Sequence, residues 1–117
     1  MIDDITRENM LAMYFDDHEV VQATLEAFLE SAIPLIDEIA ALEGMVTAVN
    51  INRKIHAIKG AVGAIGGQRA YEYFAVKEKQ ILNSSQSEQI KICREVVELC
   101  RKIVDQVKII GKRSEAA

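Results

Sequence analysis

The sequence is poor in the residues that punctuate β-structure, since its 117 residues include one proline, six glycines and no tryptophan. An all-β sandwich needs a turn signal about every ten residues, whereas four of the glycines fall between Gly60 and Gly67. Three tyrosines and three phenylalanines are fewer aromatic residues than a base-stacking nucleic-acid module uses. The formal net charge is −4, and both signs are mixed along the chain. We therefore expect neither a β-sandwich nor a nucleic-acid-binding protein.

Long apolar runs are also missing, and cysteine is scarce. No apolar run approaches the roughly 18 residues of a membrane helix. Residues 1–4 include two aspartates where a signal peptide carries basic residues, so we expect a cytosolic protein without a membrane partner. Cys93 and Cys100 are seven residues apart, which places them about 10 Å apart on one helix face and too far apart for a disulfide. We expect both cysteines to be buried as small apolar side chains.

A 3.6-residue apolar period runs through nearly the whole chain. Half of the residues are hydrophobic and 27% are charged, which is typical of one globular domain of this size. The predicted helices are 6–15, 16–43 with a stop at Gly44, 47–65, 68–82 and 85–111. Four long amphipathic helices with short connections predict an all-α fold, an antiparallel four-helix bundle with a short additional N-terminal helix. Residues 1–111 would form this domain, and residues 112–117 a frayed C-terminal tail.

Each long helix has apolar positions that should face the core. Capping-box patterns, Asp16 with Glu19 and Ser85 with Glu88, are predicted to begin the second and fifth helices. The apolar positions of the second helix are Val21, Leu25, Phe28, Ala32, Leu35, Ile39 and Leu42. Those of the third helix are Ile51, Ile55, Ile58, Val62 and Ile65. Those of the fifth helix are Cys93, Val96, Val97, Cys100, Ile103, Val104, Val107 and Ile110.

The unusual chemistry lies on the third helix, at His56, Lys59, Gly60 and Gly63. Their spacing places these four residues on one helix face. This face is turned by about 100° from the isoleucine positions, because each residue advances the helix by that angle. We therefore expect the imidazole on the side of the bundle, with an ammonium group one turn away. An ordinary exposed histidine among weak helix formers is the alternative.

Two glycines in a helix interior need a physical reason, because each costs roughly 1 kcal/mol relative to alanine. Gly60 and Gly63 leave the surface beside His56 without side chains, and Ala57 and Ala61 keep it low. We expect these four small residues to let another protein approach the imidazole closely. A reactive histidine, a nearby cation and a clear approach fit a phosphoryl group that is carried on nitrogen.

The segment His56–Gly66, with the sequence HAIKGAVGAIG, resembles the signature of histidine-containing phosphotransfer (HPt) domains. That signature reads His-x-hydrophobic-Lys-Gly-small, with a glycine ten residues after the histidine, and the segment meets every position. One departure is Ala61, because many members have a serine after the Lys-Gly pair and its hydroxyl is absent here. The length, the helix count and Pro34 in the second helix are also similar, so the resemblance extends over most of the chain.

The resemblance implies a four-helix bundle that acts in a phosphorelay of two-component signal transduction. His56 would accept a phosphoryl group from an aspartate of one response-regulator receiver domain and pass it to an aspartate of another. Lys59 would partly neutralise the phosphoryl charge. The domain would have no kinase activity and no cofactor of its own, because the receiver supplies Mg²⁺ and an acidic pocket. The resemblance does not distinguish a stand-alone relay protein from a module of a hybrid sensor kinase.

A carboxylate interrupts the apolar side of the fourth helix. Tyr71, Phe74, Glu78 and Ile81 share one face, and members of the HPt family often have a glutamate or glutamine at the position that matches Glu78. A carboxylate that accepts a hydrogen bond from Nδ1 of His56 would leave Nε2 as the nucleophile. The alternative is a glutamate that extends to solvent at the edge of the bundle, and the sequence does not decide between the two.

Three alternatives to a relay through His56 can be weighed from the sequence. We interpret His18 as an ordinary surface or capping histidine, because the acidic segment 16–19 around it would repel a phosphoryl group and no Lys-Gly pair follows it. A di-iron bundle needs Glu-x-x-His on facing helices, whereas Phe15 and Arg53 stand three residues before the two histidines, so no metal site is expected. A helical-bundle interaction or regulatory domain that carries no phosphate remains as the alternative function.

Overall fold

The residues that the structure describes form five α-helices and one short 3₁₀ helix. The computed structural model describes the backbone of residues 1–42 and 47–116, and the side chains of these residues up to Lys112. The elements are α1 (Arg7–Met13), α2 (His18–Ala41), α3 (Ala48–Ala64), α4 (Gln68–Gln80), the 3₁₀ helix η1 (Ile81–Asn83) and α5 (Gln86–Ala116). No strand occurs in the described ranges, so the predicted all-α class is confirmed.

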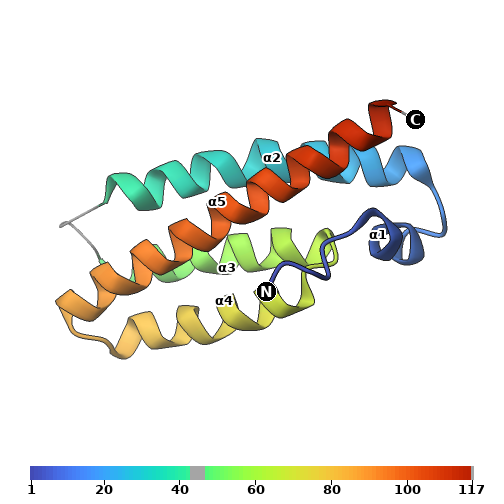
Figure 1. Ribbon diagram of the computed structural model, residues 1–117. Coiled ribbons are helices and arrows are strands. Elements are labelled where there is room, and N and C mark those ends of the chain that lie inside the picture. Colours follow the sequence, from blue (N-terminus) through green and yellow to red (C-terminus); the bar gives the residue numbers. More distant parts are fainter. Residues whose placement is uncertain (43–46, 117) are drawn as a thin grey trace.

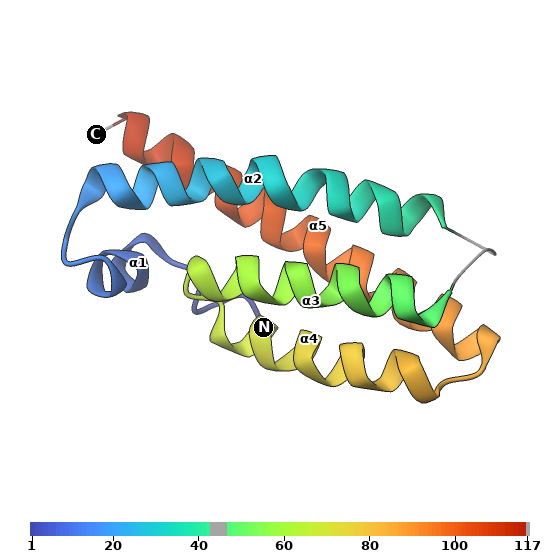
Figure 2. The same cartoon turned by 180° about the vertical axis from the view of Figure 1, so that it is seen from behind.

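The four long helices run antiparallel and form an elongated bundle (Figure 1). Helix α3 packs along α4 and α2 packs along α5, and the Cα atoms span 47 × 22 × 18 Å. Helix α1 lies at the end of the bundle where α2 begins (Figure 2). The predicted antiparallel bundle with an additional short N-terminal helix is confirmed.

The N-terminus of α2 differs by one residue from the predicted position. Its N-cap is Asp17, whose Oδ1 accepts a hydrogen bond from the backbone N–H of Val20 at 3.1 Å. Asp16 cannot take this role because its φ of 58° is left-handed, whereas an N-cap residue has an extended backbone. The predicted cap of α5 is present, since Ser85 Oγ accepts from the backbone N–H of Glu88 at 3.3 Å.

Two glycines turn the chain sharply between α3 and α4. Gly66 has a φ of +81°, which glycine adopts without steric cost. The backbone N–H of Gly67 donates to the carbonyl oxygen of Val62 at 3.0 Å, and a Cβ at Gly67 would lie 2.5 Å from Val62 Cγ1. Only glycine fits this approach, and the chain therefore folds back so that α4 lies along α3.

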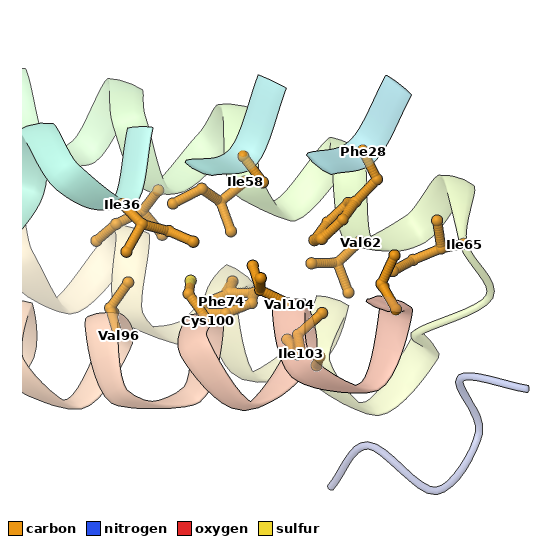
Figure 3. Close-up of a cluster of buried hydrophobic side chains, with 14 of the residues drawn as sticks. Phe28, Ile36, Ile58, Val62, Ile65, Phe74, Val96, Cys100, Ile103 and Val104 are labelled. Atoms are coloured by element: carbon orange, nitrogen blue, oxygen red, sulfur yellow. The ribbon is translucent and has the colours of Figure 1, made fainter. Parts of the chain in front are cut away.

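The core is built from the apolar faces of all five α-helices, and Figure 3 shows part of it. In α2, Ile36 is 4% exposed and buried, whereas Leu35, which the spacing predicted, is half-buried. Steps of three and of four residues both keep to one helix face, so packing against the neighbouring helices decides between the two positions. Cys93 and Cys100 are both buried with free thiols, as expected.

Helix ends depart from the sequence prediction at two places. Helix α4 ends at Gln80 and the 3₁₀ helix η1 begins at Ile81, whereas the predicted helix ended at Leu82. Helix α5 continues to Ala116, although residues 112–117 were predicted to be a frayed tail. The segment is rich in lysine, arginine, glutamate and alanine, which extend an existing helix at little cost without an apolar period. The predicted stop at Gly44, like Ala117, lies outside the described residues.

Candidate functional site

His56 lies in the middle of α3, and its side chain is 69% exposed. Its neighbours Ile55 and Ile58 are buried in the core, at 0% and 1% exposed. A Cβ built at Gly60, one turn further along α3, would have no atom within 4 Å, and Ala57 is exposed as well. The imidazole thus stands on the flank of the bundle with open space beside it, the position that the helical spacing predicted.

Glu78 meets this imidazole from α4. Its side chain is 11% exposed, and its Oε2 lies 2.9 Å from Nδ1 of His56. An ionised carboxylate only accepts hydrogen bonds, so a neutral imidazole in this contact carries its proton on Nδ1 and keeps a lone pair on Nε2. Of the two alternatives for Glu78, the buried one holds: the side chain faces the histidine and does not extend to solvent.

Lys59 binds the second oxygen of the same carboxylate. Its Nζ donates to Oε1 of Glu78, and its side chain is 14% exposed. Burial alone would raise the pKa of the Glu78 carboxyl, but the hydrogen bonds from Lys59 and His56 outweigh it and lower that pKa below its usual value. The hydrogen bond to Glu78 raises the pKa of Lys59 above its usual value, against the lowering effect of burial. The carboxylate is therefore held ionised between a cation and an imidazole.

Two further residues complete the site, and sequence reasoning assigned neither a role. Asn52 Nδ2 donates to the backbone oxygen of Glu78 at 2.5 Å, which links α3 to α4 one turn before His56. The Nζ atom of Lys59 lies 5.4 Å from the centroid of the Tyr71 ring. Their spacings were the available signal, since Asn52 is four residues before the histidine and Tyr71 is seven before the glutamate.

The four small residues that were expected to serve docking occupy different places. Gly60 and Ala57 are exposed, with open space at Gly60. Gly63 is half-buried, and a Cβ there would lie 3.3 Å from Cδ2 of Tyr71. Ala61 is half-buried and packs against the core. Gly60 and Ala57 therefore form the low surface beside the imidazole, while Gly63 accommodates a ring of α4.

An exposed apolar surface lies at the turn between α1 and α2. Phe15 is 95% exposed with a φ of 56°, and Met13 is 43% exposed. The hydroxyl of Tyr14 donates to the carbonyl oxygen of Ala64 at 2.6 Å, which fixes this turn to the end of α3. Ala64 is eight residues beyond His56, or about 12 Å along the helix axis. Helical periodicity does not identify Phe15 as exposed, because the conformation of the turn places this side chain in solvent.

Among the residues that the structure describes, neither the second histidine nor a group of metal-ligating side chains forms a competing site. His18 is the first residue of α2 and is exposed beside the N-cap Asp17. In the described part of the chain, no three histidine, cysteine, aspartate or glutamate side chains gather in a way that would hold a metal ion. None of the helices described combines the length and the apolar character that crossing a membrane requires.

The arrangement suits nucleophilic chemistry at one nitrogen. An exposed imidazole whose tautomer is set by a carboxylate has its free lone pair on Nε2, and a cation nearby can balance negative charge. Comparison of the chain with protein-family models, with curated proteins and with solved structures found no match.

Proposed function

We propose that this protein is a phosphorelay intermediate of the histidine-containing phosphotransfer type that works in the cytoplasm. It accepts a phosphoryl group on Nε2 of His56 from an aspartate of one receiver domain and passes it to an aspartate of another. The observation that carries the proposal is the contact of 2.9 Å between Nδ1 of the exposed imidazole and the buried Glu78 carboxylate. It directs the free lone pair to Nε2, and the open space at Gly60 leaves the approach clear for another protein.

The transfer exchanges a phosphorus–oxygen bond for a phosphorus–nitrogen bond. The lone pair of neutral Nε2 attacks phosphorus in line with the bond to the aspartate. The aspartate departs as a carboxylate, so no proton has to move in this step. The ring gains positive charge as the new bond forms. The Glu78 carboxylate, which accepts a hydrogen bond from Nδ1–H, stabilises that charge. Transfer to the second receiver reverses these changes and regenerates neutral His56. Each receiver supplies its own Mg²⁺.

The Glu78 carboxylate uses its two oxygens for two different partners. By accepting a hydrogen bond from Nδ1 at Oε2, it selects the tautomer of His56 with a nucleophilic Nε2. At Oε1 it binds Lys59, which compensates the negative charge of the carboxylate without displacing Nδ1 from Oε2. A lysine ammonium has three donors, so the donors that Glu78 does not use can stabilise the charge on phosphoryl oxygens.

Receiver docking would use the low and apolar surfaces around the imidazole. Gly60 and Ala57 form a low, exposed surface beside the imidazole. Phe15, at 95% exposed, offers an aromatic ring whose burial on docking is favourable. Its turn is held against the end of α3, so a partner that covers His56 can reach both places.

Phosphoryl transfer from receiver domains tests the proposal. Receivers encoded by the same genome are phosphorylated with labelled phosphate and mixed with the wild-type protein, His56→Gln and His18→Gln. We expect label on the wild-type protein and on His18→Gln, and none on His56→Gln, although its circular dichroism spectrum and melting temperature match the wild type. Label on His56→Gln contradicts the proposal. Receiver binding without any transfer to the wild-type protein identifies an interaction or regulatory domain instead.

A further inference from the structure

The ring of Tyr71 lies beside two residues of α3. Nζ of Lys59 is 5.4 Å from the ring centroid. A Cβ at Gly63 would lie 3.3 Å from Cδ2 and 3.7 Å from Cε2 of the ring. The first of these distances is tighter than an ordinary carbon–carbon contact. Gly63 therefore makes room for the ring against the backbone of α3, where an alanine would displace it.

This ring restricts where the ammonium group of Lys59 can lie. A lysine stem is flexible and normally carries its charge out to water. The face of an aromatic ring attracts a cation within about 6 Å of its centroid. Tyr71 and Glu78 are seven residues apart on one face of α4, so the same position of the ammonium group serves both. The Lys59 side chain is accordingly only 14% exposed.

We propose that Tyr71 is a positioning residue that holds the ammonium group of Lys59 on the Glu78 carboxylate and thereby acts, through that carboxylate, on the imidazole of His56. The inference deepens the proposed function and, as far as transfer is concerned, rests on it. Tyr71 acts through Lys59, and Gly63 acts by admitting the Tyr71 ring to the helix surface.

Removal of the Tyr71 ring should change the pH dependence of phosphoryl transfer in one direction. When the ammonium group of Lys59 spends less time on Oε1 of Glu78, the negative charge of the carboxylate is less compensated. The protonated form of the imidazole is then favoured, and fewer molecules have a free lone pair on Nε2 at a given pH. The acid limb of the rate–pH profile of transfer therefore moves to higher pH.

The charges that act on the Lys59 ammonium group and on the Glu78 carboxylate come from α3 and α4. The groups that act on the ammonium group are Glu78 and Tyr71, both on α4. From α2, Glu38 is bound by Lys54 at 2.7 Å, and this lysine stands two residues before the histidine, about 200° around α3. Arg53, three residues before the histidine, is exposed. The groups that act on the Glu78 carboxylate are Lys59 and His56, both on α3.

The chain contains a second lysine–tyrosine–glutamate arrangement, which has no histidine in it. Nζ of Lys77 lies 5.2 Å from the centroid of the Tyr73 ring and 2.9 Å from Oε2 of Glu95. This arrangement joins α4 to α5. Tyr73→Leu removes the same kind of contact away from the relay site and is therefore the matched control for Tyr71→Leu.

The experiment compares Tyr71→Leu, Tyr71→Phe and Tyr73→Leu with the wild-type protein. The imidazole resonances of His56 are followed against pH by NMR without a partner, and the rate of transfer from a phosphorylated receiver is measured over the same pH range. Tyr71→Leu is expected to move both curves to higher pH and to slow transfer on the acid limb roughly two- to fivefold, the factor for one cation–π contact. Tyr71→Phe keeps the ring and should follow the wild type, as should Tyr73→Leu.

Several outcomes overturn the inference. It fails if the Tyr71→Leu curves coincide with those of Tyr73→Leu, or if Tyr71→Phe behaves like Tyr71→Leu. If the NMR titration moves as expected but even the wild-type protein accepts no phosphate from any receiver, the positioning role stands and the proposed function fails. Should Tyr71→Leu not fold, Gly63→Ala displaces the ring by a few tenths of an ångström and must move the titration in the same direction.

Discussion

Replacement of Gly60 by alanine tests whether the missing side chain beside His56 serves docking. Gly60 lies in the interior of α3, and a Cβ there would meet no atom within 4 Å. Its φ is not positive, so alanine fits the backbone. The substitution adds helix propensity without a clash, and the free energy of unfolding should rise by about 1 kcal/mol. For a domain of this length, that corresponds to an increase of about 4 °C in Tm.

The same methyl group stands where a partner approaches His56. Phosphoryl transfer requires the reacting atoms to lie in line at about 3–3.5 Å, and a misplacement of about 1 Å can cost up to about 100-fold in rate. We therefore expect Gly60→Ala to slow transfer from a phosphorylated receiver on the order of tenfold. If Gly60→Ala is more stable than the wild type and transfers phosphate more slowly, then Gly60 serves docking at the expense of stability.

Gly111→Ala is the matched control on α5. A Cβ at Gly111 has its nearest contact at 3.9 Å, with Nε2 of Gln22, which is an ordinary separation. This variant should gain a similar stability of about 1 kcal/mol and transfer phosphate at the wild-type rate. Thermal unfolding by circular dichroism and label transfer are measured on both variants. If Gly60→Ala transfers as fast as Gly111→Ala, a cleared surface at Gly60 is not needed; if it melts below the wild type, the inferred open space is wrong.

Three further predictions concern stability and thiol reactivity. Because hydrogen bonds lower the pKa of Glu78 in the folded protein, its ionised form stabilises the fold above the ordinary value of 4.5, and this contribution is lost as the pH falls through the lower folded value. Denaturant unfolding should show the advantage of the wild type over Glu78→Gln shrinking toward acid pH, and a gap independent of pH would contradict this. Ile58→Ala, at 1% exposed, should cost about 2–5 kcal/mol in denaturant unfolding, whereas Val49→Ala, at 57% exposed, should cost under about 0.5 kcal/mol; similar costs would argue against the packing described. Burial raises the pKa of the Cys100 thiol to about 12 and also raises the pKa of Cys93, so a thiol reagent should label both cysteines in denaturant and neither in the native protein, and rapid native labelling would show that they are accessible.

The residues of the site differ in how far the sequence could place them. His56 and Gly60 were located by helical spacing alone, because the angle between residues of one helix is set by local geometry. Lys59 was placed on the correct face, but not on its partner, since a flexible four-carbon stem takes its direction from the helix beside it. Gly63 was assigned to docking, whereas its environment includes the Tyr71 ring, which a pattern within α3 could not reveal.

Two small errors in the prediction of α2 have a similar origin. Asp16 and Asp17 are both good caps by residue type, and only the left-handed backbone at residue 16 excludes the first of them. Leu35 and Ile36 are both compatible with the apolar face of α2, and packing against the neighbouring helices selected Ile36. In each case two sequence positions were equivalent by residue type, and the backbone conformation or the packing of the folded chain distinguished them.

The sequence by itself determines a bundle of four long helices with a histidine, a lysine and a glycine on one flank. It does so because hydrophobic periodicity and residue spacing act within single helices. Only the tertiary structure decided that the carboxylate of Glu78, 22 residues from His56, is buried against Nδ1 and shared with Lys59. That contact depends on the register of α4 against α3, which the glycine turn at residues 66–67 and the packing of both helices set together. No pattern within one helix specifies such a register.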